Sequence, residues 1–411
     1  MSALLTPKSE TATVGTGLTL ITLIAVAILW ATNVRPISGY VVSALSLFLF
    51  AGVTLTRGEH VTGVVRDHAL LAYLAYVASA LLMSLALSDQ DPSGVALDAL
   101  VLLGYGAIYA STSSLCDTCR GNVTWGVAFL AGGLAVYGLA AHEIPELYIQ
   151  QKFYNQHAVT GTFSNPNHFA TFLGFGLVVS LSLALTQPKF DAKPIILGSI
   201  CLYALLQTGS RAGLAASVIG LACTAIAHQM ARGGSKGLNI RTGNRRLWIY
   251  AATGLGIILI MGLGSVTLER LGRLVADAPI RITLYADVLQ AIAAAPLTGY
   301  GLGSFDEVYR TLQSPSVNID RAWRSAHSAP LETLFESGAA IFVLPLAAIA
   351  LYGRRLTQTL KAKATAPALA AAGILATGLA HSLFDNTLAT PAVGAVFAAG
   401  LGLARPLEAH A

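Results

Sequence analysis

Residues 277–313 read DAPIRITLYADVLQAIAAAPLTGYGLGSFDEVYRTLQ, and residues 314–338 continue with SPSVNIDRAWRSAHSAPLETLFESG. This polar stretch interrupts an otherwise apolar chain and carries four arginines and one histidine, namely Arg281, Arg310, Arg321, Arg324 and His327. Ionisable side chains beside an apolar segment mark functional sites by default. We therefore expect this stretch to hold the chemistry and the apolar segments on either side of it to set the fold.

The apolar segments have the composition of a membrane protein. Hydrophobic residues make up 55% of the 411 residues and charged residues only 11%, whereas about a quarter of the residues of a soluble domain are charged. Apolar runs of roughly 20 residues recur along the chain, and each is long enough to cross a bilayer. We predict an all-α, polytopic helical bundle, one membrane domain over residues 1–411, with twelve transmembrane spans near residues 15–33, 38–56, 67–88, 93–113, 122–141, 168–186, 194–208, 211–230, 247–266, 329–352, 366–383 and 389–404.

The distribution of basic residues predicts the orientation of these spans, because cytoplasmic loops are enriched in Lys and Arg. With a cytoplasmic N-terminus, most of the 25 basic residues fall inside, and six of the outer ones lie in one long outer loop, residues 267–328. We expect this loop to be partly helical and residues 142–167 to form a second outer loop. The first span is too long for a signal-peptide core, so we expect no cleavable signal.

Several other classes of site are not supported by the sequence. Topology accounts for the net charge of +5, so we expect no nucleic-acid partner. Cys116 and Cys119 form a single CxxC without further ligands nearby, whereas a structural zinc site needs four ligands. The basic loop 231–246 lacks the GxxxxGK[ST] pattern of a phosphate-binding loop, and a membrane-side anchor is the simpler interpretation. We predict no cofactor and no metal ion.

Residues 161–168, GTFSNPNH, are the first candidate site segment outside the long loop. Asn165 before Pro166 predicts a turn, and Asn167 is a candidate N-cap for the sixth span. A turn and a cap do not account for His168, an ionisable group at the mouth of a span, so we include it among the functional candidates.

Residues 207–213, QTGSRAG, are the second candidate segment, because they place Arg211 in the short reversal between spans seven and eight. An arginine that extends to the membrane interface is one interpretation. The other is an anion contact, in which Ser210 caps the next helix and Arg211 and the helix N-terminal amides both favour phosphate.

Within the long outer loop, Pro279 is typical of a helix start, and Pro296 is typical of a helix end. The residues between them form one apolar stripe, with Leu284, Val288, Leu289 and Ile292. The glycines of GYGLGS, residues 299–304, then permit a tight turn.

His327 precedes the tenth span, where the positive end of the helix dipole favours a neutral imidazole, the form that acts as a general base. On its own, a histidine in such a position is more often a hydrogen-bonded loop residue than a catalyst. Glu332 and Glu336 follow one turn apart on an apolar helix, and buried carboxylates need partners, for which the loop arginines are candidates. Three further residues are expected to be polar lining at the outer end of span eleven: His381, Asp385 and Asn386.

Three separated patterns occur together: GTFSNPNHFA, then SRAG at a helix start, then R-(x)14-PLxGYGxGSF followed by AHSxxLExxxESG. In this combination the chain resembles the bacterial O-antigen ligase and polymerase family, polytopic GT-C-type membrane glycosyltransferases that use polyprenyl-diphosphate-linked glycans. The motifs cover about residues 160–340, and the twelve-span plan with one long periplasmic loop covers the rest. HSLFD, residues 381–385, is also similar to that family's last paired spans. Many members carry Asn after the loop histidine, where this chain has Ser328.

The resemblance implies a multi-pass protein of the bacterial inner (cytoplasmic) membrane with its active site facing the periplasm. His327 is then the expected general base for an acceptor sugar hydroxyl, and Arg281 and Arg211 are expected to bind the diphosphate leaving group. The reaction would invert the anomeric centre and be metal-independent, because arginine supplies the positive charge. The expected substrate contacts are Asn165, Asn167, His168, Tyr300, Arg324 and Glu332.

The implied donor is a glycan linked to undecaprenyl diphosphate, but the acceptor is left open. Ligation to the lipid A-core of lipopolysaccharide, as the family's namesake reaction, is slightly favoured. Polymerisation of O-antigen or exopolysaccharide repeat units on a growing glycan and transfer to a protein are the other two possibilities. Membrane lipids are the remaining expected partner.

A polytopic transporter is the alternative from another class, since twelve spans with polar groups inside would suit one. However, no internal repeat relates the two halves of the sequence, as it does in many transporters. A transporter also gives no reason for the arginine-bearing loop. Convergence of Arg211, Arg281 and His327 on one outward-facing site is the observation that would separate the two hypotheses.

Overall fold

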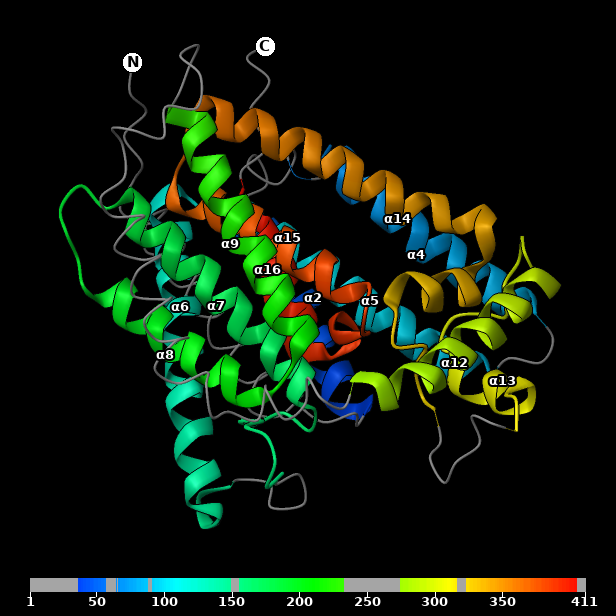
Figure 1. Ribbon diagram of the computed structural model, residues 1–411. Coiled ribbons are helices and arrows are strands. Elements are labelled where there is room, and N and C mark those ends of the chain that lie inside the picture. Colours follow the sequence, from blue (N-terminus) through cyan, green and yellow to red (C-terminus); the bar gives the residue numbers. More distant parts are fainter. Residues whose placement is uncertain are drawn as a thin grey trace.

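The computed structural model describes residues 36–56, 64, 66–87, 91–148, 155–232, 274–315 and 323–404, and the regular structure of these residues is entirely helical (Figure 1). The α-helices are, in chain order, α2 (Pro36–Thr56), α4 (His68–Ala86), α5 (Pro92–Ser113), α6 (Asp117–Glu143), α7 (Pro166–Thr186), α8 (Lys193–Thr208), α9 (Arg211–Arg232), α12 (Leu274–Ala294), α13 (Phe305–Leu312), α14 (Ala329–Ala362), α15 (Ala366–Ser382) and α16 (Pro391–Gly402). Two short 3-10 helices, η1 (Pro145–Leu147) and η3 (Thr387–Ala389), lie in loops.

The helices have the lengths and compositions of a polytopic membrane protein. Within the described residues, six are long and apolar enough to cross a bilayer: α4, α5, α6, α7, α9 and α14. Shorter apolar helices of 10–17 residues occur within α2 and as α8, α15 and α16. Ten of the predicted spans therefore coincide with an apolar helix, and the other two, 15–33 and 247–266, lie outside the described residues.

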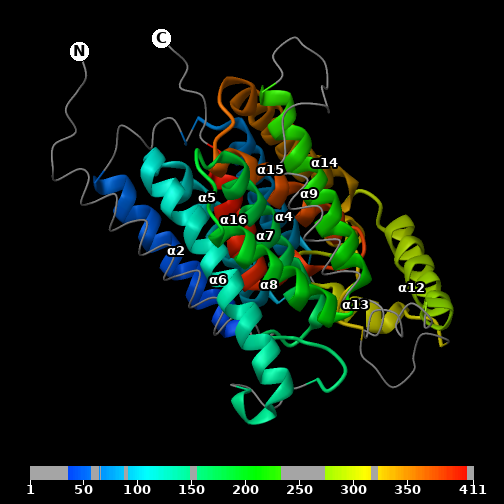
Figure 2. The same ribbon diagram turned by 60° about the vertical axis from the view of Figure 1, so that its left-hand side comes forward.

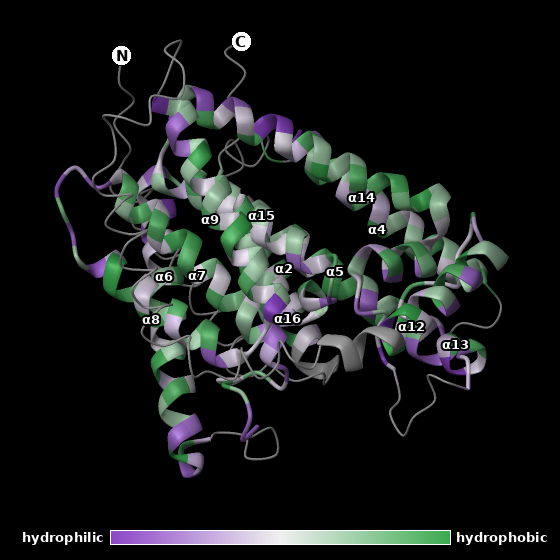
Figure 3. Cartoon of the chain, viewed as in Figure 1, coloured by the Kyte–Doolittle hydropathy of each residue, from purple (hydrophilic) through white to green (hydrophobic). Residues whose placement is uncertain are grey.

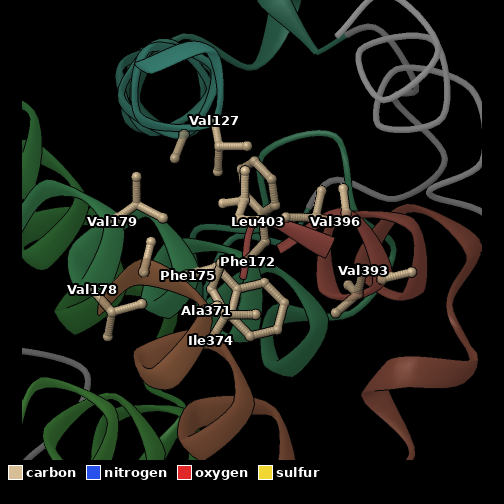
Figure 4. Packing of buried hydrophobic residues seen from close by; sticks show 14 of the residues in the cluster. Val127, Phe172, Phe175, Val178, Val179, Ala371, Ile374, Val393, Val396 and Leu403 are labelled. Atoms are coloured by element: carbon tan, nitrogen blue, oxygen red, sulfur yellow. The ribbon is translucent and has the colours of Figure 1, made fainter. Parts of the chain in front are cut away.

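Helix α7 lies at the centre of the bundle. Its apolar window is 94% buried within the protein, compared with 22% for α14. Its aromatic residues Phe172 and Phe175 pack between side chains of α6, α15 and α16 (Figure 4). A helix that is apolar on all sides and still buried from lipid must be surrounded by other helices, so α7 is the scaffold on which the neighbouring elements are placed.

Small residues allow the helices around α7 to approach closely. Gly220 of α9 faces Thr377 of α15, and a Cβ on this glycine would lie 1.9 Å from the Thr377 hydroxyl oxygen. Such contacts are typical of helix packing in lipid, where close backbone approach replaces the hydrophobic driving force. The contact fixes α15 against α9 and so fixes the position of the loop that follows α15.

Helix α14 is interrupted at Gly338, whose φ of 66° and ψ of 167° are not helical. The predicted span 329–352 thus falls within α14, but the sequence did not predict the break at Gly338. Residues before and after the break run in different directions in Figure 1. The turn after α12 docks on the break, because the Ala339 amide donates to the Pro296 carbonyl at 2.8 Å and the Gly301 amide donates to the Glu336 carbonyl at 2.8 Å.

Helices α12 and α13 belong to the predicted outer loop, residues 267–328, and lie to one side of the bundle in both views (Figure 1, Figure 2). Helix α12 begins at Leu274, five residues before the proline predicted to open it. Leu284 and Val288 are buried against Phe305 and Phe335, but Leu289 is 54% exposed. The prediction that Leu289 shares a stripe with Leu284 was wrong. Leu289 follows Leu284 by five residues, which turns its side chain about 140° away around the helix.

At the end of the bundle far from the start of α14, a cluster of polar groups joins α14 to its neighbouring helices. Arg355 of α14 forms an ion pair with Asp67, which caps α4, and Tyr109 of α5 donates to the same carboxylate. The guanidinium also lies 4.8 Å from the ring centroid of Tyr352, whose hydroxyl donates to the Leu401 carbonyl. Figure 3 shows the general pattern, with hydrophobic residues along the bundle helices and hydrophilic ones at helix ends and on α13.

Candidate functional site

The candidate site is built around Asp385, in the loop that follows α15. Its Oδ1 lies 3.1 Å from Nδ1 of His327 and accepts a 2.9 Å bond from the Asn386 amide. Its Oδ2 accepts a 2.7 Å bond from Nδ2 of Asn167 in α7. The side chain of Asp385 is 3% exposed and that of His327 is 27% exposed. A buried carboxylate thus supports a histidine that reaches the surface.

The environment of Asp385 keeps its carboxyl group ionised. Burial alone would raise the pKa of Asp385. The opposing effects are larger: they are the hydrogen bond from His327, the charges of His168 and His327, and the hydrogen bond from Asn167. Together they hold the pKa well below the ordinary carboxyl range. A carboxylate only accepts hydrogen bonds, so Nδ1 of His327 carries the proton. Nε2 then holds a free lone pair, which is the arrangement of a general base oriented by a carboxylate.

The backbone of His327 is held in an unusual conformation. Among the described residues, it is the only one other than glycine with a positive φ, 49°. Such a conformation costs on the order of 1–3 kcal/mol and persists only where the surroundings enforce it. The His327 amide donates to Oγ of Ser325 at 3.1 Å, its carbonyl accepts from the Tyr285 hydroxyl at 3.2 Å, and its ring meets the edge of Trp323.

Glu332, in the first turn of α14, provides part of that enforcement. Its Oε2 accepts from the Ser325 hydroxyl at 2.6 Å and the Ala326 amide at 2.8 Å, and its Oε1 accepts from Nδ2 of Asn386 at 2.5 Å. The sequence-based hypothesis gave Glu332 the loop arginines as partners and a role in substrate binding. In the structure its partners are neutral groups of the two segments that carry His327 and Asp385.

Arg281 reaches the same place from α12. Its guanidinium donates to the Phe384 carbonyl at 3.3 Å and hydrogen-bonds the hydroxyl of Tyr285, the group that also donates to His327. Burial raises the pKa of the Tyr285 phenol, and the positive charge of Arg281 partly offsets this. The Arg281 side chain, which comes from α12, therefore contacts the loop that carries Asp385. Tyr285 connects it to His327, because the Tyr285 hydroxyl hydrogen-bonds both residues.

Arg211 lies on the other side of the end of α15. The Gly213 amide donates to Oγ of Ser210 at 3.2 Å, so the predicted serine cap of this helix is confirmed. A Cβ on Gly213 would lie 3.3 Å from Cε1 of His381, four residues before Asp385. The first turn of α9, which begins at Arg211, is therefore packed directly against the last turn of α15.

The segment that begins α7 contributes to the site through different atoms from those predicted. Asn165, not Asn167, is the N-cap, because Pro166 occupies the first helical position and the Asn165 side chain accepts from the Asn167 amide at 2.8 Å. Asn167 is then free to donate to Asp385. His168 hydrogen-bonds the Thr390 hydroxyl at 2.7 Å, and so ties α7 to the start of α16.

Two of the predicted site residues are not brought to this cluster. Tyr300 donates its hydroxyl to the Ala291 carbonyl at 2.9 Å and stacks on Phe335. Arg324 is 68% exposed and lies 3.9 Å from the carboxylate of Asp306 on α13. Tyr300 thus contacts α12 and α14 and Arg324 lies near α13, and their predicted contacts with substrate remain predictions.

The sequence reading noted Asp385 and Asn386 but gave them no role. Asp385 stands 58 residues after His327, and no local pattern joins the two. The only signal was an acid and an amide directly after a histidine at the end of an apolar helix, in HSLFD-N. Within the described residues, no group of three or more His, Cys, Asp and Glu side chains is arranged to hold a metal ion.

Comparison with protein families matches residues 196–346 to the Wzy_C model, O-antigen ligase. This range contains Arg211, Arg281 and His327, whereas Asn167, His168 and Asp385 lie outside it. The chain has no match among curated proteins. Residues 196–346 thus match an O-antigen ligase domain, in agreement with the resemblance seen in the motifs, and the apolar helices within and around this segment are those of a polytopic membrane protein.

Proposed function

We propose that this protein transfers a glycan from undecaprenyl diphosphate to a sugar hydroxyl of an acceptor on the periplasmic side of the bacterial inner membrane. The observation that carries the proposal is the convergence at the end of α15. Arg281 contacts the Phe384 carbonyl, His327 pairs with Asp385, and the helix turn that begins at Arg211 packs on His381. Arg281 and a supported base thus lie beside the same loop, with the first turn of α9 packed next to it, and this supports glycosyl transfer from a diphosphate.

In the proposed step, Nε2 of His327 takes the proton of the acceptor hydroxyl as its oxygen attacks the anomeric carbon of the donor. The new carbon–oxygen bond forms as the bond from that carbon to the diphosphate oxygen breaks. Attack from the side opposite the diphosphate inverts the anomeric centre. The imidazolium is stabilised by the Asp385 carboxylate until it loses its proton to water, which returns the base to its starting state.

The leaving group needs positive charge rather than a proton, because undecaprenyl diphosphate departs as a stable anion. Arg281 and Arg211 are the proposed source of that charge, since a planar guanidinium binds phosphate oxygens with two parallel hydrogen bonds. The N-terminal amides of α9 add to the positive potential beside Arg211. Asn167 and His168 shape the α7 wall of this site.

The acceptor decides between two versions of the reaction. We favour ligation of the glycan to lipid A-core, and the alternative is addition of repeat units to a growing O-antigen or exopolysaccharide. The same base and the same arginines serve both, because both acceptors offer a sugar hydroxyl. The two versions differ in which intermediate accumulates when the enzyme is inactive.

The test is glycan analysis in a deletion strain complemented with the wild type, His327→Ala or the matched control His157→Ala. His157 is an exposed histidine that hydrogen-bonds Gln156 and Asn155 and lies outside the cluster. We expect His327→Ala to lower transfer by about 10²–10⁴-fold, the usual contribution of a general base, and His157→Ala to retain full transfer. Normal expression of both variants in the membrane is required.

The stranded intermediates then identify the acceptor. Long polymer left on undecaprenyl diphosphate together with bare lipid A-core would identify a ligase. Single repeat units left on undecaprenyl diphosphate would identify a polymerase. Unchanged glycans in every fraction, with His327→Ala as active as the wild type, would contradict the proposed function. The transporter hypothesis would then be favoured.

A further inference from the structure

Glu332 contacts both segments of the His327–Asp385 pair through a single carboxylate. One oxygen, Oε2, takes the Ser325 hydroxyl and the Ala326 amide, at 2.6 and 2.8 Å. The other, Oε1, takes Nδ2 of Asn386 at 2.5 Å. Its side chain therefore spans the gap between the loop before α14 and the loop after α15.

On the histidine side, the carboxylate acts one residue away from the base. The Ser325 hydroxyl that donates to Glu332 also accepts from the His327 amide at 3.1 Å. The Ala326 amide, which donates to Glu332, belongs to the residue just before His327. These bonds fix the backbone on the N-terminal side of His327, where φ is 49°, and a strained conformation needs such fixation to persist.

On the aspartate side, the carboxylate acts one residue beyond Asp385. The Asn386 side chain donates to Glu332, and the Asn386 amide donates to Oδ1 of Asp385, the oxygen that faces His327. Ser328 makes no side-chain capping bond to α14. Glu332 thus joins the two loops alongside the direct His327–Asp385 hydrogen bond.

We propose that Glu332 is a positioning residue that sets the distance and orientation between His327 and Asp385, and that it does not contact substrate. The proposal rests on the proposed function, because it assigns Glu332 a role in the same transfer. It differs from the sequence-based hypothesis, in which Glu332 binds substrate. It also differs from a purely structural role, in which Glu332 would affect only how much folded protein is made.

The first test separates these three roles by kinetics of the purified full-length protein with an undecaprenyl-diphosphate-linked oligosaccharide donor and a lipid-linked sugar acceptor. We expect Glu332→Ala to lower kcat by about 10²-fold, because a displacement of about 1 Å at a catalytic group has that effect, with both KM values within about threefold of the wild type. Glu307→Gln, an exposed acid on α13, is the control and should leave kcat unchanged.

The second test is a reciprocal exchange that keeps the contact but reverses its polarity. Glu332→Gln alone should be mild, because its amide oxygen still accepts from Ser325 and Ala326. Asn386→Asp alone should lower kcat more, because two carboxylates then face each other at hydrogen-bond distance. The double variant restores an amide opposite a carboxylate, and we expect its kcat to exceed that of Asn386→Asp by about tenfold.

Four results would overturn the inference. Glu332→Ala with kcat within twofold of the wild type would remove any positioning role. A raised KM at unchanged kcat would return Glu332 to substrate binding. A double variant no faster than Asn386→Asp would show that the bridge between the two loops does not matter for transfer. Loss of folded protein with unchanged kcat per folded molecule would leave a structural role and also contradict the inference.

The outcome for His327→Ala keeps this test separate from that of the proposed function. If His327→Ala is inactive while Glu332→Ala retains kcat, only the role of Glu332 fails. If His327→Ala transfers glycan as well as the wild type does, the proposed function is contradicted. Glu332 would then have no catalytic pair to position.

Discussion

The charge on Asp385 decides which nitrogen of His327 is free to act as a base. The carboxylate accepts a hydrogen bond from Nδ1 at 3.1 Å, and Nε2 is then the nitrogen without a proton in the neutral ring. Because the pKa of Asp385 is held well below the ordinary carboxyl range, the contribution of this group to folding stability is present above that range. It is lost only as the pH falls through the lowered native value.

Replacing Asp385 by Asn should impair the reaction, and the folded protein should also lose the stability that the lowered pKa of Asp385 supplies. The variant keeps the shape of the side chain but removes the charge that fixes the tautomer and stabilises the imidazolium, so we expect kcat to fall by about 10²–10⁴-fold. The measurement is single-turnover transfer by the purified variant. Asp306→Asn, which removes an exposed partner of Arg310 on α13, is the control. Equal activity of Asp385→Asn and the wild type would mean that His327 needs no carboxylate.

Among the elements, the break in α14 has the clearest physical cause. Gly338 has a φ of 66°, and a Cβ there would lie 2.3 Å from the carbonyl oxygen of Leu297. Gly299 faces it with a φ of 63°, and its own Cβ would lie 2.5 Å from the Glu336 carbonyl oxygen. Two glycines in left-handed conformations thus let the turn after α12 dock on α14. This contact connects the element that carries Arg281 to the one that begins beside His327.

A Gly338→Ala substitution should test this docking. The added methyl group meets backbone atoms and cannot adopt the observed φ without strain, so we expect the melting temperature in detergent to fall by several degrees and transfer to fall with it. Gly353→Ala lies in the same helix with no heavy atom within 4 Å of the added Cβ. That control should be neutral or stabilise the helix by up to about 1 kcal/mol. If Gly338→Ala keeps the melting temperature and transfer activity of the wild type, the break in α14 is not required for either.

Local sequence patterns predict single helices but not contacts between residues that are distant in the sequence. Apolar runs are local, and the described spans coincide with apolar helices, because burial in lipid or in the bundle demands them. The break at Gly338 was missed because one glycine in an apolar helix does not reveal its φ. The role of Asp385 was missed because its partner is 58 residues away. Arg281 and His327 could be proposed from the sequence because charge is rare in an apolar chain, and their catalytic roles remain predictions.

The orientation of the whole molecule ties these elements to function. The first residues of α7, α9 and α14 and the last residues of α15 meet at one end of the bundle, whereas the Asp67–Arg355 ion pair lies at the other. Successive spans run in opposite directions, so residues that are scattered along the sequence share one membrane face. The excess of basic residues in the predicted cytoplasmic loops predicts that the His327 end faces the periplasm.

Labelling of single cysteines should test that placement. In a variant that lacks the four native cysteines, Ala293→Cys on α12 and Gln358→Cys near the end of α14 each introduce an exposed thiol, one at either end of the molecule. We expect a membrane-impermeant maleimide to label Ala293→Cys in intact spheroplasts and to label Gln358→Cys only after permeabilisation. Retained transfer activity shows that each variant is folded. The reverse pattern would put His327 and Arg281 on the cytoplasmic side, and a periplasmic glycosyl transfer would then have no base.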